Sequence, residues 1–128
     1  MTKVSINTTK LGRKEPTKVD VNVKNIKKSL AFRGSIFDLD KLTKKFEGAE
    51  DVQNDTFGYL SADNERMAKE LDLTLDFLKD ILELNTKEIK ALESLDWGQI
   101  SAISGEINGK IMIPTNEEGV EEGTPSKS

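Results

Sequence analysis

The sequence predicts a mainly α-helical fold: a small helical bundle with a short N-terminal β element and disordered polar termini. Apolar residues recur with helical spacing through the centre and the C-terminal third of the 128-residue chain. A residue able to cap a helix precedes each of the last two apolar runs. One short segment, residues 19–24, alternates apolar and polar residues as a half-buried strand does.

The chain length fits a single domain between two polar ends. Residues 1–17 are polar, contain Gly12 and Pro16, and are predicted to be a mobile basic arm. Residues 18–113 are predicted to form one mainly helical domain. Residues 114–128 are rich in Glu, Gly, Pro and Ser and are predicted to be a disordered acidic tail.

Short elements are expected in the first half of the domain. Residues 19–24 predict an edge strand, and residues 25–33 predict a short helix capped by Asn25 and broken at Gly34. Leucine and phenylalanine spacing predicts a second helix over 36–46, ended by Gly48. Residues 49–61 are predicted to be a polar connector.

The central helix is expected to begin near residues 61–64 and to run to Leu84. Its apolar residues cover about half of the circumference at 100° per residue. A helix this broadly apolar is flanked on more than one side, either in the middle of a bundle or at a subunit contact. The narrow stripe consists of Met67, Leu71, Leu75, Leu78 and Leu82, and the widening flank of Leu73, Phe77, Ile81 and Leu84.

Two capping boxes are expected to start the last two helices, at Asn85 with Glu88 and at Asp96 with Gln99. The final helix, about 96–112, carries an isoleucine stripe, and its other side carries Ser101, Gly105 and Gly109. Each glycine inside a helix costs about 1 kcal/mol relative to alanine. We infer that this small-residue face meets another helix, within the chain or across an interface; the alternative is fraying near the end of the fold.

Composition argues against enzymatic function. The chain has no His and no Cys, and it contains no nucleotide-binding loop. Asp38-Leu39-Asp40 has the spacing of a metal-binding pair, but two acids early in a helix are expected surface residues. We therefore predict no catalytic, cofactor-binding or metal-binding residues. No apolar run approaches the roughly 20 residues of a membrane span, so no membrane partner is expected.

Charge is distributed unevenly along the chain. Residues 1–50 carry 12 Lys/Arg and 6 Asp/Glu, a net of +6, whereas residues 51–128 carry 7 and 17, a net of −10. The favoured interpretation is that the halves neutralise each other inside one fold. The alternatives are a basic arm for nucleic acid or an acidic partner, and head-to-tail self-association. Nucleic acid is disfavoured, because the predicted helix over 86–94 is charge-balanced.

The segment LDLTLDFLKDILELN (residues 71–85) resembles a signature region of tail assembly chaperones of long-tailed bacteriophages of Gram-positive hosts. The similarity covers about residues 19–112 and includes the Leu95-Asp96-Trp97 turn. The resemblance implies a non-enzymatic protein that binds the tape-measure protein during tail morphogenesis and helps recruit tail-tube subunits. It also implies that the protein acts in the host cytoplasm and leaves before the virion is mature.

The pattern and the resemblance lead to one mechanism, in which an apolar flank of the protein's central helix binds an amphipathic helix of the client. The predicted protein-binding residues are Leu73, Phe77, Ile81, Leu84, Ser101, Gly105 and Gly109. Phe77 and Leu84 are expected on the surface, so changing both to Asp should abolish client binding and leave the helices intact. The alternatives are an oligomeric connector protein of a virion and a small nucleic-acid-binding regulator.

Overall fold

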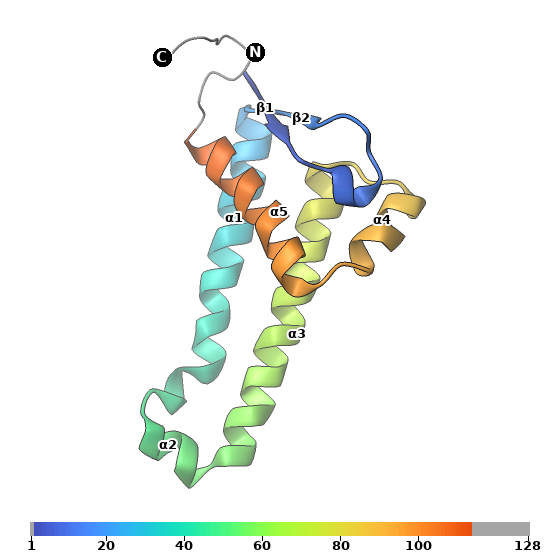
Figure 1. Cartoon of the computed structure of the whole chain (residues 1–128). Helices are drawn as coiled ribbons and strands as arrows, with labels where there is room; N and C mark the ends of the chain where they lie inside the picture. The colour runs from blue at the N-terminus through green and yellow to red at the C-terminus, as the bar shows by residue number, and fades with distance from the viewer. Residues whose placement is uncertain (1, 114–128) are drawn as a thin grey trace, which may run out of the picture.

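A computed structural model describes residues 2–113 and confirms a mainly α-helical fold with a short β element (Figure 1). Two long antiparallel helices form a hairpin, and a third helix lies across its upper half. No helix among the described residues is long and apolar enough to cross a bilayer. The elements are β1 (Lys3–Ile6), the 3₁₀ turn η1 (Thr9–Leu11), β2 (Thr17–Asp20), α1 (Val23–Leu39), the 3₁₀ segment η2 (Asp40–Phe46), α2 (Ala49–Asn54), α3 (Thr56–Ile81), α4 (Thr86–Glu93) and α5 (Trp97–Met112).

The core forms where α5 meets the end of α3 and the β element. The isoleucine stripe of α5 is buried as the sequence predicts. It packs with Leu78 of α3, with Leu82 just after α3, and with Val4 and Ile6 of β1. Each of these side chains contributes about 1.5–3 kcal/mol by leaving water. The four stripe residues are Ile100, Ile103, Ile107 and Ile111.

The N-terminal segment belongs to this core, so the prediction of a mobile arm over residues 1–17 is wrong for the described residues. β1 pairs antiparallel with β2, and Val4 lies opposite Val19. Val4 and Ile6 are fully buried, and Leu11 is 2% exposed. Few apolar residues suffice here because Val4, Ile6 and Leu11 are all buried. The predicted tail over 114–128 lies outside the described residues.

Helix α1 begins earlier and ends later than expected. The Asn22 side chain accepts a hydrogen bond from the Asn25 backbone N–H at 2.8 Å, so Asn22 caps the helix and the strand ends at Asp20. The predicted break at Gly34 is wrong, because α1 continues through it to Leu39. Packing against α3 offsets the propensity cost of one glycine. The predicted helix over 36–46 is divided between α1 and η2.

The hairpin tip is also helical, so the predicted connector over 49–61 is wrong. Asp55 accepts a hydrogen bond from the Gly58 N–H at 3.0 Å and starts α3 at Thr56, before the predicted start near residue 61. Tyr59 meets Phe46 edge to face with ring centroids 5.5 Å apart. Phe57, in the same turn of α3 as Tyr59, is 86% exposed.

Both predicted capping boxes are confirmed. Asn85 and Glu88 exchange hydrogen bonds at 2.8 and 3.0 Å at the start of α4. Asp96 and Gln99 do the same at 2.8 and 3.1 Å at the start of α5. These local contacts fix the two turns that fold the C-terminal third back onto the hairpin.

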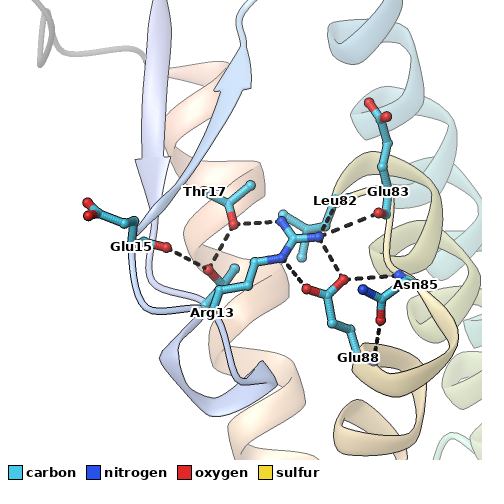
Figure 2. Close-up of polar contacts among 8 residues, drawn as sticks. Arg13, Glu15, Thr17, Leu82, Glu83, Asn85 and Glu88 are labelled. Atoms are coloured by element: carbon cyan, nitrogen blue, oxygen red, sulfur yellow. Dashed lines mark hydrogen bonds and ion pairs between the residues drawn. The ribbon is translucent and has the colours of Figure 1, made fainter.

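Arg13 fastens the β element to the turn between α3 and α4 (Figure 2). Its guanidinium donates to both carboxylate oxygens of Glu88, at 2.7 and 2.9 Å, and to Thr17 Oγ1 at 2.8 Å. It also donates to the Leu82 carbonyl at 3.0 Å, which no helical N–H serves once α3 has ended. The hydrogen bond from Arg13, aided by the Asn85 backbone N–H, lowers the pKa of Glu88 to about 2. No local pattern in the sequence predicts this clamp, because Arg13 and Glu88 lie 75 residues apart.

A candidate protein-binding groove

An open apolar groove of about 300 Å³ lies between α1, α3 and α5. Helix α1 supplies its aromatic wall, α3 supplies one polar edge, and α5 supplies the floor and the far wall. The lining residues are Phe32, Arg33, Ile36, Phe37, Glu70, Thr74, Trp97, Ser101, Ser104 and Gly105.

Helical spacing places these side chains on facing surfaces. Phe32 and Ile36 are one turn apart on α1, and Phe37 extends the wall outward with 72% of its surface exposed. On α5, Trp97, Ser101 and Gly105 follow one another at intervals of four. The groove is therefore lined by two phenylalanines and an isoleucine on the α1 side, and on the α5 side by Trp97 followed by small residues.

Small residues on α5 keep the groove open. A Cβ atom added to Gly105 or Gly109 meets no heavy atom within 4 Å among the described residues. No helix within residues 2–113 packs closely on these glycines, so the described part of the chain offers no within-chain explanation for them. Contact with another chain remains the prediction for this face.

The polar groups beneath the groove are satisfied within the protein. Thr74 donates to the Glu70 carbonyl at 2.7 Å, and the Asn108 amide donates to the Ser104 carbonyl at 2.9 Å. Asn108 also accepts from the buried Ser29 hydroxyl, which joins α5 to α1. The surface left at the groove is consequently mainly apolar.

Arg33 is the exception to this internal pairing. Its Nε atom is buried and has no hydrogen-bond partner among the described residues. A buried unpaired donor costs about 1–3 kcal/mol. Glu70 of α3 lines the same groove as Arg33, so the lining carries one cation and one anion.

The predicted binding residues divide into three groups. Ser101 and Gly105 line the groove, and Gly109 is exposed further along α5 but outside it. Leu73 is half-buried and lines a second, shallow hollow between α1 and α3. Phe77 and Ile81 are only 7% and 6% exposed, and Leu84 packs half-buried against the core, so the expectation of a free flank on α3 is corrected for these three residues.

Sequence reasoning did not assign the aromatic wall of the groove to a site. Phe32, Ile36 and Phe37 fell on both sides of the expected break at Gly34, which hid their common face. Trp97 packs against the core and also lines the groove. A continuous helix over 23–39 would have revealed the wall.

Comparison with known proteins identifies the family to which this architecture belongs. No curated protein and no solved structure shows significant similarity to the chain. A family model described as phage tail assembly chaperone proteins, TAC, matches residues 4–117. The match runs from β1 past the end of α5 and includes every residue of the groove, and it agrees with the resemblance noted in residues 71–85. The chain thus belongs to the family of phage tail assembly chaperones.

Proposed function

We propose that this tail assembly chaperone binds an amphipathic helix of the tape-measure protein in the groove between α1, α3 and α5. The observation that carries the proposal is an open apolar groove with a glycine floor in a domain whose other large apolar side chains are mostly packed. Amphipathic helices bind such grooves through apolar anchors at intervals of three and four residues.

The size of the groove suits a partner that must later be released. About 300 Å³ accommodates only a few apolar side chains of a client helix, which is the lower end of the range for binding pockets. We propose that the protein acts without catalysis in the host cytoplasm. It keeps the tape-measure protein soluble, helps recruit tail-tube subunits and departs before the tail is complete.

A pair of glycine substitutions tests the groove. Gly105→Leu places a side chain in the groove, starting from a Cβ position that no heavy atom of the described residues approaches within 4 Å, and Gly109→Leu makes the same change outside the groove. Both changes favour the helix, by about 0.5–1 kcal/mol, so neither should lower the free energy of unfolding. We expect Gly105→Leu to weaken tape-measure binding at least tenfold, which corresponds to about 1.4 kcal/mol, and we expect Gly109→Leu to leave it unchanged.

Trp97 provides the readout. It is the chain's one tryptophan and it lines the groove, so its emission should change when peptides spanning the tape-measure protein are titrated in. Loss of binding in both variants would assign recognition to the glycine face of α5 as a whole. Unchanged binding in Gly105→Leu would contradict the groove as the client site.

A further inference from the structure

A buried polar contact joins α1 to α5. The Ser29 hydroxyl donates a hydrogen bond to the side-chain oxygen of Asn108, whose amide donates to the Ser104 carbonyl at 2.9 Å and to Ser104 Oγ at 3.3 Å. Ser29 is fully buried, and it shares burial in α1 with Leu39 alone. A polar side chain therefore anchors α1 at this point. A satisfied buried hydrogen bond is directional and specifies one arrangement of the two helices.

This contact closes one end of the client groove. Every α1 residue that lines the groove follows Ser29 in the chain, and every α5 residue that lines it precedes Asn108. Figure 1 shows α1 and α5 crossing near the end of the molecule that contains the β element and separating from there. The groove is therefore a wedge, closed at Ser29 and Asn108 and open toward the hairpin tip. Phe37 lies eight residues beyond Ser29, about 12 Å along α1.

The two ends of the wedge differ in the side chains that line them. Near the closed end α5 contributes Ser104 and Gly105, where α1 and α5 are already joined by a hydrogen bond. The open end is lined by Phe37, which is 72% exposed, and by the half-buried Trp97. A helix bound in the wedge thus meets restricted space at one end and large apolar side chains at the other.

We propose that the hydrogen bond between Ser29 and Asn108 is a positioning contact that fixes the width of the client groove, and that the resulting wedge selects client helices with a bulky apolar residue two turns from a small one. This selection rests on the proposed function, and it specifies the chemical class of the client helix. The spacing follows from α5, where Trp97 and Ser104 are seven residues, or two turns, apart. The bulky residue packs beside Phe37 and Trp97, and a Gly, Ala or Ser of the client lies at the closed end.

Three amphipathic helical peptides test the selection. They share one sequence without tryptophan and differ at two apolar positions two turns apart, which carry Leu and Ala, Leu and Leu, or Ala and Ala. We expect the Leu/Ala peptide to bind about tenfold more tightly than either of the others, measured by the emission of Trp97, because a second bulky residue overpacks the closed end. A groove that only buries apolar area favours the Leu/Leu peptide instead, and that order would overturn the proposal.

A double substitution removes the directional contact. Ser29→Ala with Asn108→Leu, called the apolar variant, replaces both hydrogen-bonding side chains by apolar groups, a change that can be nearly neutral for stability. Neither residue lines the groove, so the surface offered to the client is unchanged. We expect the apolar variant to bind the Leu/Ala and Leu/Leu peptides with similar affinity. Ser29→Ala alone is the smaller change and should reduce the preference in the same direction.

Thr8→Val is the matched control for the loss of a buried hydroxyl. Thr8 is fully buried between β1 and η1, and its hydroxyl shares a hydrogen bond with the Thr17 hydroxyl at 2.8 Å. Valine keeps the shape of the side chain, and neither threonine lines the groove. This variant should retain the preference for the Leu/Ala peptide, even where it lowers the free energy of unfolding.

A distance measurement tests the positioning role without a client. The chain has no Cys, so Asp38→Cys at the end of α1 and Ala102→Cys on α5 can carry spin labels at exposed positions that do not line the groove. Double electron–electron resonance should give one narrow distribution of label-to-label distances in the otherwise unchanged protein and in Thr8→Val. The distribution should broaden in the apolar variant, because no directional bond then holds α5 to α1.

The two readouts separate a failure of the wedge from a failure of the proposed function. If none of the peptides binds, the client groove is wrong, and the distances alone decide whether Ser29 and Asn108 fix the position of α5. If the apolar variant keeps either the narrow distance distribution or the preference for the Leu/Ala peptide, the positioning role is overturned and the groove remains a client site.

Discussion

Replacing Phe77 with alanine should lower the free energy of unfolding by about 3–5 kcal/mol, the range for removing a large buried aromatic side chain. Phe77 is 7% exposed, and its ring stacks on Phe32 with centroids 4.5 Å apart and an interplanar angle of 12°. This stack joins α1 to α3 where the hairpin enters the core. Urea unfolding followed by circular dichroism measures the effect.

Leu71→Ala is the matched control on the same helix. Leu71 is 36% exposed, so its truncation should cost less than about 1 kcal/mol. Phe77→Asp should prevent folding altogether, because it buries a carboxylate without a partner. A folded, helical Phe77→Asp protein that had lost only client binding would restore Phe77 to the surface role that the sequence pattern suggested.

Leu71 and Phe77 differ in burial although both belong to the apolar face of α3, and the sequence pattern cannot resolve this difference. Periodicity identified α3 and its wide apolar face correctly, but it does not say which part of that face another element covers. Phe77 is covered by α1, whose continuity through Gly34 was not expected. The flank interpreted as a client surface is consequently the inner face of the hairpin.

Local signals made the C-terminal third predictable. The Asn85 and Asp96 capping boxes join residues three apart, so the sequence alone contains all the partners that start α4 and α5. The isoleucine stripe of α5 has one strong period and is buried as expected. In the N-terminal half the deciding contacts are distant in sequence, as in the hydrogen bond from Arg13 to Glu88.

The groove was predictable only in part for the same reason. Ser101 and Gly105 were identified because their spacing on a single helix is visible in the sequence. The aromatic wall opposite them comes from α1, and the two surfaces face each other only through the packing of three helices. Small residues on one helix therefore suggest that its surface is accessible, but the side chains that turn this surface into a groove come from another helix and depend on the tertiary structure.

Removing the Arg13 clamp should have the second large effect on stability. Arg13→Ala leaves the Glu88 carboxylate, whose side chain is only 16% exposed, without its cation, and leaves the Leu82 carbonyl without a donor. Losing charged hydrogen bonds of this kind costs about 2–4 kcal/mol at neutral pH. Arg13→Lys should recover only part of the loss, because an ammonium cannot donate in parallel to both carboxylate oxygens.

The pH dependence of stability identifies the clamp independently of the size of the loss. The pKa of Glu88 is about 2 in the folded protein, below its ordinary value of 4.5, so unfolding raises the affinity of this carboxyl for a proton. The stabilisation is therefore complete above about pH 4.5 and declines as pH falls toward 2. Glu88→Gln is the reference protein, since its amide oxygen can still accept from the Asn85 N–H of the capping box.

The stability difference between the unchanged protein and Glu88→Gln should accordingly be largest at neutral pH and shrink between pH 4.5 and 2. In Arg13→Ala the pKa of Glu88, followed by NMR titration, should rise toward 4.5 and stop short of it, because the Asn85 N–H still favours the carboxylate. A pKa that does not move would mean that the capping box alone lowers it. The β element would then be held to α4 by its buried valine, isoleucine and leucine side chains and not by this ion pair.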